Sequence, residues 1–361
     1  MKVVMKGAAV FVLLTVILGM ATPSFAGAPE ATSSASEQPG SVIVFPKFMK
    51  GTVAVDGVMK AQTEIEVRAR CPIRATCPED EPVKIKFHWV CPGDDAAASL
   101  VCKAAGFDLL LSVNGKASFN PENPQTSGED RARVAPCPSG YLIGWVISAT
   151  SDRPIKYDGL TGIAVLRDGN GAIETYEAIP IPADPNLAIR ADIATDIDPR
   201  TGSPALAFDG GAGHYQAVAG AIPANLEYQR LTGPLSTSEA ALILLTLDVR
   251  FNRPNYPTVV DFDFRSDEGN WASTGRNFTC WGEMKNPYPD VYFALLGART
   301  RNGLVLSGRA VKIPLKGISD IPGPVTLLGL VSTDEGGGRS MDPAYLFKES
   351  QNGRPNSVLV P

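Results

Sequence analysis

Short runs in which apolar and polar residues alternate recur along the chain from residue 41 onward. In the segment Thr63–Arg70, for example, Glu64 and Glu66 alternate with Ile65 and Val67. Successive side chains of a β-strand point to opposite faces, so this period of two gives one buried face and one solvated face. The pattern therefore predicts a strand-rich chain.

The predicted strands are separated by clusters of turn-forming residues, and the turn Asp168–Gly171 joins two of them as a hairpin. Leu242–Val249 is interpreted as a buried strand, although a helix over Ser238–Leu247 with Thr237–Glu239 as its cap is the alternative. We predict strands at Val42–Phe45, Thr63–Arg70, Val83–Val90, Phe107–Val113, Gly140–Ser148, Gly162–Arg167, Ala172–Ala178, Leu242–Val249, Val259–Phe264, Asn277–Met284, Leu304–Ile313 and Val325–Ser332.

The three prolines of Ile179–Asn186 interrupt this pattern and mark the best candidate for a domain boundary. The predicted fold is all-β, with two β-sandwich domains of immunoglobulin-like type, and one larger sandwich is the alternative. The first domain would span residues 41–180. A linker or crossover at 181–204 would lead to a second β-rich domain at 205–361.

The N-terminus has the parts of a secretory signal peptide. Lys2 and Lys6 form a basic region, Gly7–Gly19 is almost wholly apolar, and Ser24–Ala26 resembles a cleavage site. We expect residues 1–26 to be removed and 27–40 to form a flexible leader. The protein is therefore expected in the periplasm or outside a bacterial cell, with no membrane span after cleavage.

Composition narrows the classes of function. The chain has 33 Lys and Arg residues against 38 Asp and Glu residues, and the basic residues form no run. This charge argues against nucleic acid as a partner, because phosphate binding needs clustered cations. The 35 glycines and 30 prolines are too many for a helical bundle and favour a turn-rich β protein.

All six cysteines follow the predicted signal peptide and are interpreted as three disulfides in an oxidising compartment. They contain no C-x-x-C pair, which argues against a zinc site formed by them. Six cysteines allow 15 pairings, and our hypothesis joins sequence neighbours first. The expected pairs are Cys71 with Cys77, Cys91 with Cys102, and Cys137 with Cys280.

The candidates for catalysis or metal binding are few. His88 is expected on the polar face of a strand, and His214 follows a glycine-rich segment that we interpret as a plain turn. Asp192, Asp196 and Asp198 offer oxygen ligands for calcium from one loop, and no other cofactor is expected. Neither a Gly-x-Ser-x-Gly elbow nor a His-Glu-x-x-His motif occurs.

Aromatic side chains are candidates for contact with a partner or a sugar, and acidic side chains are candidates for glycoside hydrolysis. Trp271 lies among turn residues and is the tryptophan most expected to be exposed, where it would contact a partner or a sugar. Asp261 and Asp263 are expected on the solvated face of a strand. A glycosidase would need two carboxylates brought together from different segments.

Several segments resemble those of a loose group of uncharacterised secreted bacterial β-rich proteins. They are Gly40–Lys47, Gly140–Ile143, Leu245–Val249 and Asn252–Pro254. The resemblance implies export and β structure. It implies no activity, so it assigns no functional residue.

The leading hypothesis is an exported, disulfide-stabilised, non-enzymatic protein that acts by surface contact. Its partner would be a second copy of itself or a cell-surface protein or polysaccharide, with exposed strand edges available for assembly. The alternative is a secreted hydrolase that acts on polysaccharide through loop carboxylates.

Overall fold

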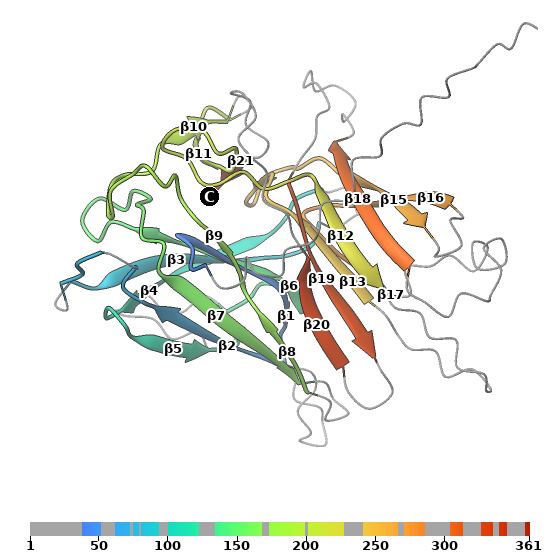
Figure 1. Ribbon diagram of the computed structural model, residues 1–361, viewed down its shortest axis with the longest axis horizontal. Helices are drawn as coiled ribbons and strands as arrows, with labels where there is room; N and C mark the ends of the chain where they lie inside the picture. The colour runs from blue at the N-terminus through green and yellow to red at the C-terminus, as the bar shows by residue number, and fades with distance from the viewer. Residues whose placement is uncertain are drawn as a thin grey trace, which may run out of the picture. The chain divides into compact units, whose positions relative to one another are not determined.

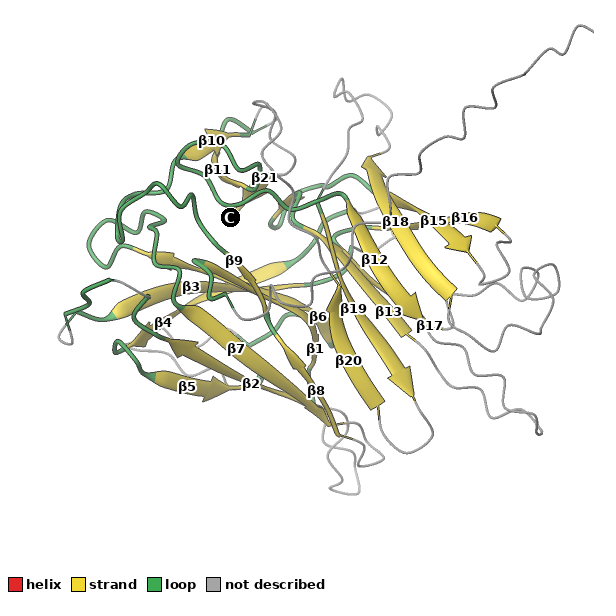
Figure 2. Ribbon diagram, viewed as in Figure 1, coloured by secondary structure: helices red, strands yellow, loops and turns green. Residues whose placement is uncertain are grey.

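Strands account for all the regular secondary structure in the described residues, which contain no helix (Figure 2). The all-β class is therefore confirmed. Within that part of the chain, no helix is long and apolar enough to cross a membrane.

The computed structural model describes the chain in several stretches, all within the compact unit Ser33–Pro361. The predicted signal peptide at 1–26 and most of the leader at 27–40 lie outside the described residues. These are 38–51, 62–72, 75–78, 81–93, 100–122, 134–167, 173–198, 201–226, 241–265, 271–285, 304–312, 326–334, 339–344 and 358–361.

Five antiparallel strands form the first sheet. Their spatial order is β4 (Ala104–Leu111), β3 (Val83–Val90), β6 (Ser139–Ile147), β1 (Val42–Met49) and β9 (Ile179–Ile181). The predicted alternation holds in β3, where Ile85 and Phe87 are buried and Lys84 and Lys86 are only partly buried.

The second sheet is a four-stranded antiparallel one. Its order is β5 (Lys116–Phe119), β2 (Gln62–Ala69), β7 (Leu160–Arg167) and β8 (Ile173–Glu177). β7 and β8 pair from Arg167 opposite Ile173, which confirms the predicted hairpin pairing. The turn itself lies outside the described residues.

Aromatic side chains from β1, β3, β4 and β5 meet in the core and so join the first two sheets. Phe48 lies edge-on to Trp89 with ring centroids 4.9 Å apart, and Phe87 stacks on Phe107 at 5.4 Å. Phe119 of β5 meets Phe107 edge-on at 5.5 Å. Such pairs add to the free energy of burying the rings, so this cluster anchors β5 on the first sheet.

Three further sheets of four strands each follow along the chain (Figure 1). One has the order β12 (Ala221–Leu226), β18 (Leu304–Lys312), β15 (Thr258–Arg265) and β16 (Trp271–Phe278). The next has the order β17 (Trp281–Lys285), β13 (Ala241–Thr246), β19 (Leu327–Asp334) and β20 (Arg339–Ala344). The last has the order β10 (Thr195–Ile197), β11 (Pro204–Ala207), β21 (Val358–Val360) and β14 (Val249–Arg250).

Prolines occupy strand positions that need no backbone donor. Pro180, Pro223 and Pro343 lie in β9, β12 and β20, and each of these strands is at the edge of its sheet. Pro46 lies in a central strand, where the register of β1 against β6 shifts between Phe45 and Phe48. Edges and bulges tolerate a residue without an N–H group. Pro180 thus does not interrupt regular structure, contrary to the prediction for Ile179–Asn186.

The strand predicted at Asn277–Met284 is wrong as one element. Phe278 ends β16 and Trp281 begins β17 in a different sheet. Cys280, between them, has φ of 65°, a left-handed conformation that breaks an extended strand. The preferred strand at Leu242–Val249 is confirmed in type, because Ala241–Thr246 forms β13 rather than a helix.

The disulfides confirm one expected pair and contradict the other two. They join Cys71 to Cys77, Cys91 to Cys137, and Cys102 to Cys280. Sequence proximity misled the prediction, because sheet register decides which cysteines meet. Val90 at the end of β3 lies opposite Tyr141 of β6, which brings Cys91 to the start of β6, two residues after Cys137.

The two halves of the described chain share contacts beyond the Cys102–Cys280 bond. Trp281 Nε1 donates a hydrogen bond to the backbone oxygen of Pro46 at 2.8 Å. Lys47 Nζ lies 3.0 Å from Glu283 Oε1. The division into domains at 181–204 stays a prediction.

Candidate functional site

A pocket of about 620 Å³ lies beside the segments that follow β6 and β9. Its apolar lining includes four prolines, and its polar lining includes one lysine and two aspartates. We call it the Lys156 pocket. Its lining residues are Gln38, Pro39, Pro72, Lys156, Asp158, Pro182, Ala183, Asp184, Pro185, Ile189, Gly210, Gln216 and Ala217.

Hydrogen bonds fix the carboxylate of Asp158 in this pocket. Its Oδ1 accepts from the hydroxyl of Ser41 at 2.6 Å and from the backbone N–H of Ala183 at 2.8 Å. The same hydroxyl accepts the backbone N–H groups of Tyr157 and Asp158. Asp158 has φ of 42°, and aspartate tolerates this left-handed conformation better than most residues.

Lys156 and Asp158 form an ion pair that is not closed by a hydrogen bond. Lys156 Nζ donates to the backbone oxygen of Asp184 at 2.8 Å, but lies 3.7 Å from Asp158 Oδ2. A direct hydrogen bond needs a shorter separation. Lysine has three N–H donors, and among the described residues Oδ2 has no nearer partner than Nζ. The pair therefore presents a donor and an acceptor to whatever enters the pocket.

Asp184 connects two loops rather than remaining available to a ligand. Its Oδ2 accepts the backbone N–H of Gly213 at 2.8 Å, and its Oδ1 accepts the backbone N–H of Asn186 at 2.9 Å. These backbone donors, Gly213 first, lower the pKa of Asp184 below its ordinary value, because they stabilise the charged form. Asp184 is thus ionised near neutral pH.

Two buried tyrosines lie close to the pocket in sequence. The hydroxyls of Tyr157 and Tyr215 have no hydrogen-bond partner within the described part of the chain. Burial raises the pKa of both phenols, and the charge of Asp158 raises that of Tyr215 further. Both therefore stay protonated at neutral pH and do not act as bases. Tyr215 is anchored by stacking on Phe208 at 5.3 Å.

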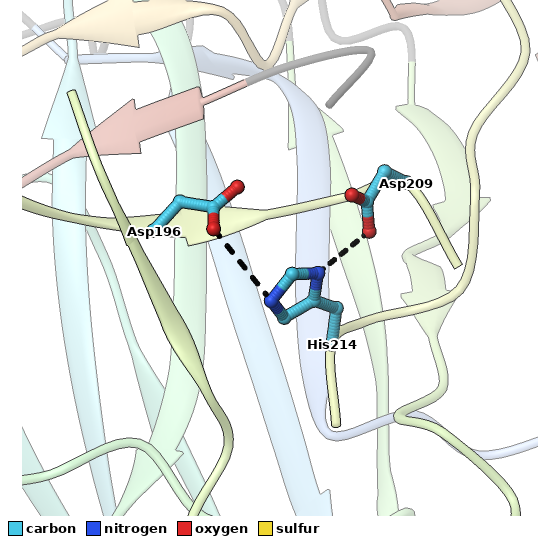
Figure 3. Close-up of side chains that lie close together, drawn as sticks. All are labelled: Asp196, Asp209 and His214. Atoms are coloured by element: carbon cyan, nitrogen blue, oxygen red, sulfur yellow. Dashed lines mark hydrogen bonds and ion pairs between the residues drawn. The ribbon is translucent and has the colours of Figure 1, made fainter. Parts of the chain in front are cut away.

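His214 lies next to the pocket between two carboxylates (Figure 3). Its Nδ1 is 2.8 Å from Asp209 Oδ1, and its Nε2 is 3.8 Å from Asp196 Oδ1. Asp209 Oδ1 also accepts the backbone N–H of Gly211 at 2.8 Å. These three side chains are the group of possible metal ligands that the structure brings together within the described residues. The interpretation of this segment as a plain turn is therefore incomplete.

The three aspartates proposed for calcium interact with three different partners. Asp192 lies 3.4 Å from the exposed Arg153, and Asp196 faces His214. Asp198 is fully buried and receives two hydrogen bonds from Arg250, at 2.9 and 2.6 Å. The structure thus does not bring these carboxylates together as one set of oxygen ligands.

His88 lies on the predicted face of its strand but is not solvated. Its ring is only 9% exposed, and it stacks on Trp145 with centroids 5.2 Å apart. Phe251 covers it at 4.7 Å. The prediction of a solvated residue is wrong because the segment after β14 packs over this end of β3.

Trp271 begins β16, opposite Arg265 of β15. It is therefore the first residue of a strand in a hairpin, and the placement of its side chain lies outside the described residues. The same holds for the side chains of Asp261 and Asp263, which are two residues apart in β15.

No family model matches the chain. No curated protein matches it either. Among solved structures, the apo form of Pleurotus ostreatus lectin (POL) aligns with 88% of this chain and 79% of its own, at 9% identity and a TM-score of 0.14. That score is too low to support an argument about fold or function.

Sequence analysis missed the Lys156 pocket. The segment Ile155–Gly159 contains the signal, because Ile155 and Tyr157 alternate with Lys156 and Asp158. Alternation puts the lysine and the aspartate on one side of the segment. The rest of the pocket could not be predicted, because Asp184 and Gly210 are distant from this segment in the sequence. Only the folded chain brings these loops together.

Proposed function

We propose that the protein is exported and acts as a binding protein, with the Lys156 pocket as the site for a hydroxyl-rich ligand such as a saccharide. The three disulfides fit an exported, stabilised protein. The open ion pair between Lys156 and Asp158 is the observation that carries the choice of ligand.

A hydroxyl group fits this pair because it donates and accepts hydrogen bonds at once. It would accept from Lys156 Nζ and donate to Asp158 Oδ2, which are 3.7 Å apart. Both would be bonds to charged groups, which are stronger than bonds between neutral groups. An anion would be repelled by Asp158, and a cation by Lys156, so a neutral ligand suits the pair best.

The walls of the pocket suit the other surface of a saccharide. Pro39, Pro72, Pro182 and Pro185 offer rigid C–H surfaces, and the amide of Gln216 offers a further donor and acceptor. Ligand pockets of this size are commonly mostly apolar, with few placed polar groups. A sugar ring has both C–H and hydroxyl surfaces, so this lining supports the proposal.

Binding is favoured over polysaccharide hydrolysis at this site. A glycosidase requires one protonated carboxyl group and one ionised carboxylate. Asp158 and Asp184 both line the pocket, but the pKa of Asp184 is lowered and both its oxygens accept hydrogen bonds. Asp184 is thus not suited to act as the acid.

Self-assembly is a second candidate, favoured by two exposed isoleucines on neighbouring strands of the second sheet. Ile163 of β7 is 40% exposed and Ile173 of the edge strand β8 is 53% exposed. Exposed apolar side chains on neighbouring strands can pack against a second copy. Light scattering tests this idea: a monomer at all concentrations would contradict it, and an oligomer dispersed by Ile173→Lys would support it.

The remaining parts of the proposal concern context. We place the protein in the periplasm or outside a bacterial cell, after removal of residues 1–26. We interpret the first two sheets as a β-sandwich, because aromatic residues of both pack in one core. Nucleic acid is not the proposed partner.

A glycan array probed with the labelled, disulfide-bonded protein tests the proposed function. We expect a defined set of neutral saccharides to bind. Lys156→Met and Asp158→Asn should each weaken binding about tenfold or more, which is the effect of losing one hydrogen bond to a charged group.

Lys84→Met is the matched control, because Lys84 also pairs with aspartates, Asp108 and Asp152, but does not line the pocket. It should leave the binding profile unchanged. The proposal is overturned if the folded wild-type protein binds no saccharide. It is also overturned if Lys156→Met binds as tightly as the wild type.

A further inference from the structure

The surroundings of His214 fix which ring nitrogen is available to a ligand. Asp209 is almost fully buried, and its Oδ1 lies 2.8 Å from Nδ1 of the imidazole. An ionised carboxylate only accepts hydrogen bonds, so Nδ1 carries the proton in the neutral ring. Nε2 then has a free lone pair, which is the form of histidine that binds metals.

The second nitrogen faces a carboxylate at a distance suited to a shared ion. Nε2 lies 3.8 Å from Asp196 Oδ1, which is too far for a hydrogen bond. Zinc bonds to nitrogen and oxygen are about 2.0–2.2 Å long, so two ligands of one ion lie up to about 4 Å apart. Figure 3 shows the imidazole between the two carboxylates, with Nε2 on the side of Asp196.

We propose that His214 Nε2 and the carboxylate of Asp196 bind a divalent transition-metal ion of the zinc class, and that Asp209 positions the imidazole. A carboxylate that accepts the other ring N–H is the usual support of a metal-binding histidine. This inference does not depend on the saccharide proposal.

The donor set decides the class of metal. One imidazole nitrogen and one carboxylate oxygen suit zinc, nickel or copper, whereas calcium takes oxygen ligands in larger number. The side chain of His214 is 15% exposed and that of Asp196 is 33% exposed. Solvent can thus reach the ion and supply its remaining ligands.

Metal binding at this site would fasten the loop that forms one wall of the Lys156 pocket. Asp196 lies in β10, and His214 ends the loop that contains Gly210, a lining residue. Asp184 already holds this loop, because its N–H donates to the oxygen of His214 at 2.8 Å. An ion that binds only the folded state also stabilises it by mass action.

Titration calorimetry with zinc chloride at about pH 7.5 tests the proposal on the disulfide-bonded protein. All six cysteines are in disulfides, so no thiolate competes for the metal. The chain has only two histidines, so ¹⁵N-histidine spectra resolve both rings. We expect one zinc ion to shift Nε2 of His214 and leave the ring of His88 unchanged.

Variants separate ligands from the positioning residue. His214→Gln should abolish binding, Asp196→Asn should weaken it about tenfold, and Asp209→Asn should weaken it about 10–100-fold, as loss of a supporting carboxylate does. Asp192→Asn is the control, since Asp192 is exposed and pairs with Arg153. It should bind zinc as the wild type does.

Two results would overturn the proposal. One is a wild-type protein that binds no zinc, which would make the cluster an ordinary charged group. The other is a zinc isotherm that is the same in the wild type and in folded His214→Gln. The ¹⁵N spectrum of the wild type decides the matter without any variant: an unshifted Nε2 of His214 at saturating zinc contradicts the proposal.

Discussion

Two buried ion pairs in this protein have opposite geometry. Arg250 and Asp198 are 5% and 0% exposed, and two hydrogen bonds of 2.9 and 2.6 Å close the pair. Lys156 and Asp158 are 7% and 20% exposed, and their charged groups stay 3.7 Å apart. The first pair is closed by direct hydrogen bonds, whereas the second lines a pocket.

The two geometries suit different roles: the closed Arg250–Asp198 pair suits stability, and the open Lys156–Asp158 pair suits the proposed binding. The planar guanidinium of Arg250 matches a carboxylate with two parallel bonds, and the hydroxyl of Thr201 donates a third bond to Asp198 at 2.6 Å. The ammonium of Lys156 is a point charge that Asp184 holds away from Asp158. The closed pair is part of the structure, and the proposed function assigns a ligand to the open one.

The largest expected loss of stability comes from removing the Cys102–Cys280 disulfide. Cys102 and Cys280 are 178 residues apart, and the chain-entropy model gives about 5 kcal/mol for a loop of this length. Replacing both by Ser should lower the free energy of unfolding by an amount of that order, measured by urea denaturation.

The short Cys71–Cys77 link is the comparison for that experiment. It closes a loop of only six residues, so its removal should cost much less. Equal losses for the two double variants would contradict the view that Cys102–Cys280 stabilises the protein by closing a long loop.

The next effect is expected at the closed pair itself. Arg250→Met leaves the buried carboxylate of Asp198 without its cation, which typically costs about 3–5 kcal/mol. Arg153→Met is the control, because the Arg153–Asp192 pair is exposed and should change stability by less than about 0.5 kcal/mol. Equal losses in the two variants would show that Arg250 and Asp198 are not a structural pair.

Double-mutant cycles then test whether the coupling energy of an ion pair depends on its geometry or on its residue types. Lys47 and Glu283 form a closed lysine pair at 3.0 Å, with side chains 9% and 23% exposed. We expect their coupling energy in unfolding to be about 1–2 kcal/mol, and that of Lys156 and Asp158 to be below about 1 kcal/mol. A larger coupling in the Lys156–Asp158 pair would contradict our interpretation of it as open.

The smallest expected effect is on the stability of the protein at acid pH. The folded-state pKa of Asp184 is lowered from 3.8 by the backbone donors Gly213 and Asn186. This carboxylate therefore contributes stability that is present above pH 3.8 and is lost as the pH falls through the folded-state pKa. Asp184→Asn should reduce the fall in melting temperature of the wild type below pH 4, and an unchanged pH profile would contradict this role.

The sequence predicts most strands and one hairpin pairing, but not how the other strands pair. Alternation in Val83–Val90 and the turn before Ile173 identify local elements, because both signals lie within a few residues. The strands with Pro180 and Pro223 were missed, since only the sheet order shows that these strands are edges. The left-handed backbone at Cys280 has no local signal in the sequence, and this residue is bonded to Cys102, 178 residues away.

The candidate sites, too, depend on contacts between residues that are distant in the sequence. Asp196 and His214 were both noted from the sequence, but for different reasons and without Asp209. Asp198, noted with Asp196, belongs to a structural pair with Arg250. Charged residues are thus visible in a sequence, whereas tertiary contacts decide which of them close on each other and which remain open.

Hydrogen–deuterium exchange of the protein with and without an array-selected saccharide tests the central claim most directly. Our account predicts slower exchange in residues 182–190 and 208–217, which contain much of the pocket lining, and unchanged exchange in 248–256, which contain Arg250. Lys156→Met should remove the protection. Protection confined to segments outside the pocket, or equal protection in Lys156→Met, would contradict the claim that the open pair is the binding site.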